Sequence, residues 1–128
     1  YNALELPQGK NEVVMNGSKV LTFAMSIVPL NVSILLKKIK SKVNKIDMFI
    51  FHQASKFIID NINRKLSIPQ KKTFENLSKV GNAISASIPI ALKDACKKNI
   101  KNNHKVIIAG YGVGLSWGSA LIKWEKIK

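Results

Sequence analysis

The stretch that decides the fold is Asp47-Met48-Phe49-Ile50-Phe51-His52-Gln53-Ala54-Ser55, an apolar run that ends in polar residues. An apolar run of this length predicts a buried strand. The serine that closes the stretch is a good helix N-cap, and apolar residues then recur at helical spacing as far as Leu66. The stretch therefore predicts a strand and then a helix, with His52 at the junction.

Upstream lies a long apolar stretch, from Val20 to Leu36, that begins just after Ser18, a credible N-cap. Pro29 interrupts it. Because proline removes an amide donor and clashes with the preceding turn, we expect Pro29 to begin a second helix, which ends near Lys40. The stretch is shorter than the roughly 20 residues that a bilayer span needs, so we expect a buried helix pair and no membrane segment.

Downstream, the sequence predicts one more long helix and two strands. Gly81-Asn82 opens an amphipathic helix from about Ser85 to Asn99. Strands are expected from Lys105 to Ala109 and from Ser116 to Trp124, joined by a glycine-rich turn from Gly110 to Gly114. Strands separated by helices pair in parallel, and the last two form a hairpin. This order predicts an α/β fold with a mixed sheet covered by helices.

The composition is that of one globular domain, or of part of one. The chain has 128 residues, of which 46% are hydrophobic and 22% charged, which excludes a disordered polyelectrolyte. A net charge of +14 favours acidic partners: nucleic acid, anionic lipid or an acidic protein. Arg64 is the only arginine, and the aromatic residues are not interleaved with the basic ones. Base stacking and bidentate phosphate contacts therefore have little support, and we expect no nucleic-acid partner.

The cysteine and histidine content argues against disulfides and metals. Cys96 is the single cysteine, as is typical of a cytoplasmic protein, and with two histidines it cannot build a four-ligand zinc site. The seven carboxylates show no paired spacing, so we expect no metal and no cofactor. Cys96 lies within a predicted helix and is expected to be half-buried rather than nucleophilic. His104 lies in a polar turn and is given no role.

Two polar residues stand where α/β folds place active sites. His52 follows a buried strand, and Asn82 precedes a helix. Each has an ordinary explanation alone, as a strand-end histidine and as an N-cap. If they converge, two neutral hydrogen-bond donors aimed at one point suit an oxygen that becomes negative during a reaction. The glycine-rich turn lacks the spacing of a dinucleotide fingerprint, so its exposed amides are its functional possibility.

Three motifs, taken in order, resemble the carboxyl-terminal half of beta-ketoacyl-acyl-carrier-protein synthase III. They are Phe51-His52-Gln53-Ala54-Ser55, the segment from Gly81 to Leu92, and the segment from Gly110 to Gly118. The resemblance covers about residues 12 to 124. It implies a thiolase-like fold in which residues 12–128 form the carboxyl-terminal half-domain. Because the sequence around Pro7 and Gly9 lacks periodicity, residues 1–11 are expected to form an extended arm before it. The chain is then a fragment, whose amino-terminal half and nucleophilic cysteine lie upstream.

The family's chemistry is a ping-pong condensation in fatty acid biosynthesis. A cysteine accepts an acyl group from acyl-CoA, and malonyl-carrier protein then loses carbon dioxide and attacks the acyl-enzyme. By resemblance, His52 and Asn82 are the remaining members of a Cys-His-Asn triad, and the backbone amide of Val113 belongs to the oxyanion hole. The resemblance also implies an acyl carrier protein partner and a homodimer of the full-length protein. The fragment alone is expected to be inert.

The sequence departs from the family pattern around the triad. Ser55 stands where asparagine is common, Ala83 where threonine is usual, and Phe57 where many members carry an arginine near the carrier-protein and CoA entrance. Lys56 and Phe57 are the residues expected at that entrance. The triad positions are intact, so the departures bear on substrate and docking. The lysines of the chain can still steer an acidic carrier protein.

Three alternatives stay open from the sequence. The first is a noncatalytic thiolase-like module that binds acyl carrier protein. The second is a related synthase that makes a specialised acyl product. The third is a basic protein that binds nucleic acid or a membrane surface, which only the net charge suggests.

Overall fold

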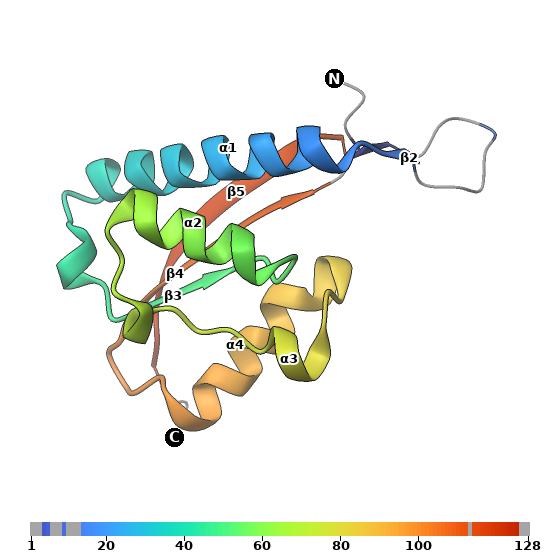
Figure 1. Ribbon diagram of the computed structural model, residues 1–128. Helices are drawn as coiled ribbons and strands as arrows, with labels where there is room; N and C mark the ends of the chain where they lie inside the picture. Colours follow the sequence, from blue (N-terminus) through green and yellow to red (C-terminus); the bar gives the residue numbers. More distant parts are fainter. Residues whose placement is uncertain (1–3, 6–8, 10–13, 113, 126–128) are drawn as a thin grey trace.

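The chain forms a three-stranded sheet with helices on both faces (Figure 1). The computed structural model describes residues 4–5, 9, 14–112 and 114–125. The strands are β1 (Leu4–Glu5), β2 (Val14–Met15), β3 (Met48–Phe51), β4 (Lys105–Gly112) and β5 (Ser116–Lys123). The α-helices are α1 (Gly17–Lys38), α2 (Lys56–Leu66), α3 (Leu77–Val80) and α4 (Ser87–Lys98). Short 3-10 turns occupy Val43–Lys45, Gln70–Lys72 and Ile84–Ala86.

The sheet is mixed, as predicted. Its order is β3-β4-β5, with β3 parallel to β4 and β4 antiparallel to β5. A further short strand at Val14–Met15 pairs with Leu4–Glu5 in a separate two-stranded sheet. Most of the predicted arm at residues 1–11 lies outside the described residues.

Strand β3 is buried along its whole length because helices cover both faces of the sheet. Phe49 and Phe51 pack in a core with α1 and α2, and their rings stack with centroids 6.2 Å apart. Met48 and Ile50 point to the other face and pack in a second core with α4. A strand covered on both faces is a continuous apolar run rather than an alternating one, which is the pattern that marked β3 in the sequence.

The predicted helix pair is wrong: α1 is one continuous helix that contains Pro29. Proline at this position cannot donate to the carbonyl oxygen of Met25, four residues earlier. Lys65, on α2, donates from its Nζ to that oxygen at 2.8 Å. A tertiary contact therefore supplies the hydrogen bond that proline removes, so the helix need not end there.

The predicted N-cap of α1 is also wrong by two residues. The helix begins at Gly17, and Asn16 caps it, because the Asn16 Oδ1 accepts a hydrogen bond from the Lys19 amide at 3.1 Å. Ser18 instead donates its hydroxyl to the same oxygen at 2.8 Å. Both residue types are good caps, and here the backbone of Asn16 is extended, as an N-cap requires.

The predicted turn from Gly110 to Gly114 is shorter than expected. Strand β4 continues through Gly112, which pairs with Ser116. Gly110 lies within the strand where the chain packs closely, since a Cβ atom there would lie 3.0 Å from Ile88 Cδ1. Glycine at this position therefore reflects close packing in a strand, and the described turn residues are Gly114 and Leu115.

Helix α1 is longer than the apolar stretch that predicted it. At 22 residues, with a mean hydropathy of 1.8 over its most apolar window, it is the one helix among the described elements that passes a length-and-composition test for crossing a membrane. Core helices pass the same test, and one face of α1 does pack on α2, β4 and β5. On its other face Leu30 and Ile34 are 55% and 56% exposed.

Candidate active site

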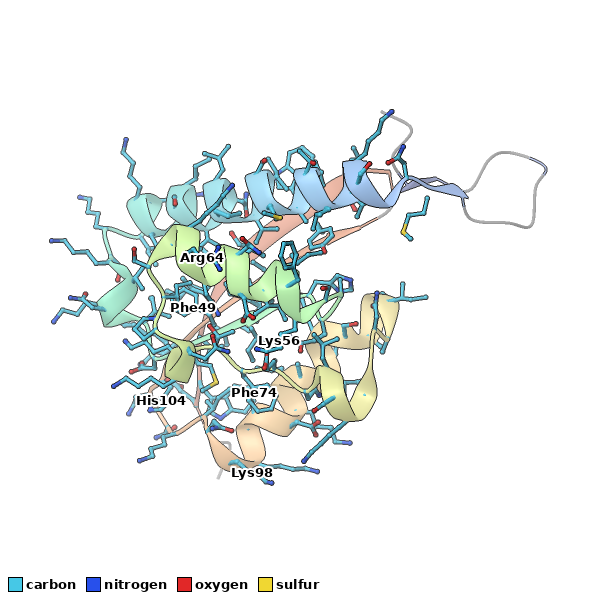
Figure 2. The ribbon with its side chains drawn as sticks, in the orientation of Figure 1. Phe49, Lys56, Arg64, Phe74, Lys98 and His104 are labelled. Carbon is cyan, nitrogen blue, oxygen red and sulfur yellow. The ribbon has the colours of Figure 1, made fainter. Side chains whose placement is uncertain are left out.

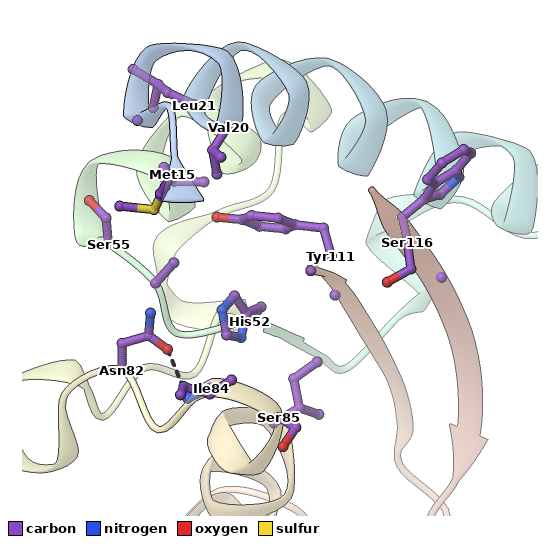
Figure 3. A pocket seen from close by; sticks show the side chains of 18 of the residues that line it. Met15, Val20, Leu21, His52, Ser55, Asn82, Ile84, Ser85, Tyr111 and Ser116 are labelled. Atoms are coloured by element: carbon purple, nitrogen blue, oxygen red, sulfur yellow. Dashed lines mark hydrogen bonds between the residues drawn. The ribbon is translucent and has the colours of Figure 1, made fainter. Parts of the chain in front are cut away.

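A pocket of about 1130 Å³ opens where β3 and β4 end, below the first turns of α1 (Figure 3). Its walls come from segments that are far apart in the sequence: the start of α1, the junction after β3, the loop before α4, and the hairpin of β4 and β5. Most of the lining is apolar, and the polar side chains in it are His52, Ser55, Asn82, Ser85, Tyr111 and Ser116. The structure therefore brings His52 and Asn82 to the same cavity.

His52 is held by the end of the sheet. Its backbone amide donates to the carbonyl oxygen of Ala109 at 2.9 Å, which continues the parallel pairing of β3 and β4 by one residue. The half-buried imidazole meets the ring of Tyr111 edge to face, with centroids 5.3 Å apart and planes at 88°. Burial lowers the pKa of His52 from its ordinary 6.5. The imidazole is therefore neutral at pH 7 and retains one N–H donor.

Asn82 is oriented by its own loop. Its Oδ1 accepts hydrogen bonds from the Ile84 amide at 3.0 Å and from the Ser87 hydroxyl at 3.3 Å. These two donors identify which end of the carboxamide is the oxygen. None of the described residues accepts a hydrogen bond from Nδ2, and Figure 3 shows the carboxamide beside His52. Asn82 therefore presents an N–H donor to the pocket.

The backbone around Asn82 is strained. Gly81 has φ 71° and ψ −163°, a combination that is essentially restricted to glycine. Ile84 has φ 50°, which is a genuine outlier for a β-branched residue. Strain of this kind persists only where the surrounding contacts enforce it, and it concentrates at functional sites. The contact between Asn82 and the Ile84 amide is one of the contacts that hold this loop.

Two buried residues tie the His52 junction to the loop that carries Asn82. Gln53 is fully buried; its Nε2 donates to the Phe51 carbonyl at 2.7 Å and its Oε1 accepts from the Asn76 amide at 3.1 Å. The Asn76 side chain in turn donates to Asp94 on α4 at 2.9 Å. The sequence signals no role for Gln53, because its partner lies 23 positions downstream. The one feature of the sequence that could have drawn attention to Gln53 is its position next to His52.

The residues expected at the entrance lie on the first turn of α2. Phe57 lines the pocket and is 58% exposed. Lys56 lies between α2 and the segment that leads into α3 (Figure 2), where its Nζ pairs with Glu75 at 3.2 Å and with Asp60 at 3.3 Å. Hydrogen bonds to Glu75 and Asp60 raise the pKa of Lys56. Two carboxylates thus compensate its charge.

The other candidate residues lie elsewhere. Val113 is outside the described residues, although Gly112 beside it lines the pocket. Cys96 is half-buried in α4, as predicted, and burial raises the pKa of its thiol. The Nδ1 of His104 accepts from the Lys101 amide at 3.2 Å. Neither Cys96 nor His104 lines the pocket.

The pocket is suited to stabilising a developing negative charge. It offers two neutral donors, from His52 and Asn82, and none of its described lining residues is a carboxylate that would repel an anion. Donors that are already oriented stabilise an oxyanion without reorganisation during the reaction. The donor at Asn82 is of this kind, because two hydrogen bonds fix its carboxamide.

A family model and curated relatives that carry one name match this chain. The family model described as 3-oxoacyl-acyl-carrier-protein (ACP) synthase III C terminal matches residues 36–124. The beta-ketoacyl-acyl-carrier-protein synthase III of Natranaerobius thermophilus is 44% identical over 123 residues, which are 94% of this chain and 37% of that protein. The protein of the same name from Porphyra umbilicalis is 39% identical over 98% of this chain and 39% of its own length.

Solved structures agree with the sequence comparison. The 3-oxoacyl-acyl-carrier-protein synthase III of Aquifex aeolicus superposes with a TM-score of 0.91 at 31% identity, over 96% of this chain and 40% of that one. The enzyme of the same name from Pseudomonas aeruginosa gives 0.90 at 26% identity, over 98% of this chain and 40% of that one. The predicted thiolase-like α/β fold is confirmed. The chain spans somewhat over a third of the length of the relatives that it matches.

Proposed function

The chain belongs to the 3-oxoacyl-acyl-carrier-protein synthase III family, and from that premise we propose that it supplies the histidine and the asparagine of a Cys-His-Asn condensing site. His52 and Asn82 act together with a nucleophilic cysteine from the amino-terminal half of the synthase. The observation that carries the proposal is that both side chains line one pocket and that hydrogen bonds fix the Asn82 carboxamide with its donor free.

The two donors act on the decarboxylation step. The bond between the malonyl carboxylate and its α-carbon breaks, carbon dioxide leaves, and the electron pair passes into an enolate whose charge lies on the thioester oxygen. His52 and the Asn82 Nδ2 donate hydrogen bonds to that oxygen, which they stabilise more strongly as it becomes negative. The carbanion then attacks the acyl group on the cysteine, and the cysteine thiolate leaves. The Val113 amide donates to the oxygen of the acyl-enzyme.

The substrates follow from the same chemistry. We propose an acyl-CoA primer and malonyl-acyl carrier protein, used in fatty acid biosynthesis in the cytoplasm. An acidic carrier protein is attracted by the net charge of +14 through long-range steering. We propose Lys56 and Phe57 as the entrance residues: Phe57 lines the pocket, where its exposed ring provides an apolar contact, and Lys56 precedes it on α2.

The remainder of the synthase covers surfaces that are open in these 128 residues. Residues 12–128 form the carboxyl-terminal half-domain, and residues 1–11 form the arm before it. Leu30 and Ile34 on α1 are exposed apolar side chains of the kind that a protein interface buries. In the described part of the chain, the outer edge of β5 pairs with no other strand. We propose that the amino-terminal half packs here, that the full-length protein is a homodimer, and that the 128 residues alone are inactive.

The test measures decarboxylation of malonyl-acyl carrier protein by the full-length synthase that contains this segment. His52→Ala should lower the rate by about 10² to 10³, because one oriented oxyanion donor contributes about that much. The matched control is His104→Ala, which removes the other histidine, outside the pocket, and should leave the rate unchanged. An unchanged rate in His52→Ala would remove the proposed role.

A further inference from the structure

A buried glutamine links the strand that leads to His52 with the segment that leads to Asn82. Gln53 follows His52 directly and is fully buried. Its Nε2 donates to the Phe51 carbonyl oxygen at 2.7 Å, and its Oε1 accepts from the Asn76 backbone amide at 3.1 Å. Each end of the carboxamide is therefore bonded to the backbone of one of the two segments.

Asn76 holds the segment of Asn82 in two ways. Its carbonyl oxygen accepts from the Val80 amide at 3.0 Å, at the start of α3, the short helix that ends two residues before Asn82. Its side-chain Nδ2 donates to Asp94 on α4 at 2.9 Å. Ser87, the first residue of α4, donates its hydroxyl to the Asn82 Oδ1 at 3.3 Å. The two routes from Asn76, along α3 and across α4, therefore both end at Asn82.

The loop cannot place Asn82 by itself. Helix α3 has four residues, far fewer than the roughly 12 that an isolated helix needs in water. Ile84, two residues after Asn82, has φ 50°, and a strained backbone persists only where surrounding contacts enforce it. Contacts with the rest of the fold must therefore fix this loop.

The fold does not depend on Gln53 alone. The Phe74 amide donates to the Phe49 carbonyl oxygen at 3.0 Å, so β3 also holds this segment two residues before Asn76. Leu77 packs against the core that α1 and α2 form with β3. Removal of the Gln53 carboxamide should therefore loosen the chain beyond Phe74 while the domain still folds.

We infer that Gln53 is a positioning residue, which through Asn76 sets the place of the Asn82 donor relative to His52. The inference rests on the proposed function, because that function gives the two donors a common target. Two donors bond one oxygen only when both lie at hydrogen-bond distance from the same point. Gln53 is adjacent to one donor and bonded to the residue that holds the other. It is fully buried and does not line the pocket, so it acts on the reaction only through other residues.

The test compares Gln53→Met with the unmodified full-length synthase in the decarboxylation of malonyl-acyl carrier protein. Methionine is of similar length but has no donor and only a weak acceptor. We expect kcat to fall about 10- to 100-fold with little change in KM, because a donor displaced by about 1 Å no longer meets the developing charge.

An Asn82→Ala background shows whether Gln53 acts through Asn82. There Gln53→Met should change kcat by less than about twofold, since no donor remains to be placed. The inference is overturned if kcat falls by the same factor in both backgrounds, or if Gln53→Met leaves kcat unchanged in a synthase that Asn82→Ala impairs.

The matched control is Asn63→Leu. Asn63 is also a buried amide with two side-chain hydrogen bonds, to Gln70 at 3.3 Å and from Thr73 at 2.8 Å, but both partners precede Phe74. Its loss should lower the melting temperature, as the loss of Gln53 does, and leave kcat unchanged. Equal falls in kcat for the two variants would attribute the effect to general loosening and overturn the inference.

Crystal structures of the unmodified synthase and of Gln53→Met give a readout that needs no turnover. The Asn82 carboxamide should be displaced by about 1 Å relative to His52 in the variant. An Asn82 that keeps its place overturns the inference. A displaced Asn82, in a synthase whose rate Asn82→Ala does not change, refutes the proposed function alone.

A second variant serves if Gln53→Met does not fold. Asp94→Ala breaks the route across α4 at a half-buried position. It should lower kcat about threefold to tenfold when Asn82 is present and leave kcat unchanged in the Asn82→Ala background. An unchanged rate when Asn82 is present would overturn the inference.

Discussion

At the scale of single residues, partial burial sets both the protonation state of His52 and its access to the pocket. The protein removes enough water to favour the neutral imidazole, and the ring still faces a pocket that a substrate can enter. In the proposed reaction a charged imidazolium would also donate hydrogen bonds, but the neutral form does not pair with a malonyl carboxylate and so does not stabilise the ground state. The environment of His52 therefore suits a donor that acts mainly on the transition state.

The first prediction concerns the titration of His52. Its pKa, followed by NMR of the imidazole ring, should lie below the ordinary 6.5, because burial disfavours the charged form. The unfolded chain then binds this proton more readily than the folded one. The stability that neutral His52 contributes is fully present above pH 6.5 and is lost as the pH falls through the folded-state pKa. His52→Gln should remove this part of the acid sensitivity, and a pKa at or above 6.5 would contradict the burial argument.

The sequence predicts the role of a residue when neighbouring residues define that role, and fails when the role depends on contacts with distant segments. His52 and Asn82 stand at the ends of elements that local patterns define, so their positions in the chain are enough to single them out. The role of Gln53 depends on Asn76, and that of Asn82 Oδ1 partly on Ser87, in a loop with an unusual backbone. The buried state of the Tyr111 hydroxyl depends on the packing of several segments. Contacts of this kind have no signature in a single sequence.

At the scale of elements, α1 shows how a tertiary contact overrides a local rule. Pro29 predicts a helix boundary from its own chemistry, and that chemistry does free the Met25 carbonyl. Lys65 satisfies the carbonyl from a helix 40 positions further along the chain. Strands β3 and β4 were predictable because their burial leaves an apolar pattern in the sequence itself. Strand β5 has no fully buried residue, and its alternating residues were the signal for it.

The second prediction tests, with a double-mutant cycle, whether the hydrogen bond from Lys65 to the Met25 carbonyl compensates for Pro29. Lys65→Ala should lower the free energy of unfolding by about 0.5 to 1 kcal/mol, because it leaves the Met25 carbonyl without its partner. In a Pro29→Ala background the new backbone N–H can bond that carbonyl, so the same substitution should cost almost nothing. Urea unfolding of the four proteins provides the cycle. Equal losses in both backgrounds would show that Lys65 does not compensate for the proline.

The third prediction tests close packing at Gly110. Gly110→Ala should lower the free energy of unfolding by about 1 kcal/mol, because the new methyl group lies 3.0 Å from Ile88 Cδ1 and one of the two must move. Ile88→Val removes that Cδ1 atom. The cost of Gly110→Ala should therefore be smaller in the Ile88→Val background, as measured by urea unfolding. A cost that does not depend on residue 88 would place the strain in the backbone instead.

At the scale of the whole molecule, α1 is covered on one side only. One face packs on α2 and the sheet, and the other exposes Leu30 and Ile34, each more than half accessible. This asymmetry is expected of a domain that packs against another part of the same synthase. Leu30 and Ile34 add to the apolar content by which α1 passes a length-and-composition test for a membrane helix.

The fourth prediction concerns that face. The 128-residue chain alone should bind a hydrophobic dye such as ANS and should self-associate, because its exposed apolar side chains are not covered. Leu30→Lys should reduce the dye binding and the association seen by analytical ultracentrifugation, while Ile34 and the apolar pocket still bind dye. Ser33→Lys adds the same charge at an exposed polar position of the same helix and should change neither. Equal effects of the two substitutions would attribute the association to charge rather than to the apolar face.

The proposed reaction depends on a hydrogen bond from the Asn82 Nδ2 to an oxygen that becomes negative. The most direct measurement is the rate of carbon dioxide release from malonyl-acyl carrier protein by the full-length synthase carrying Asn82→Asp. Aspartate keeps an oxygen for the Ile84 amide and the Ser87 hydroxyl, so the loop is retained while the donor is replaced by a negative charge. We expect kcat to fall by about 10² or more with little change in KM. A variant that releases carbon dioxide at the unmodified rate would contradict the account.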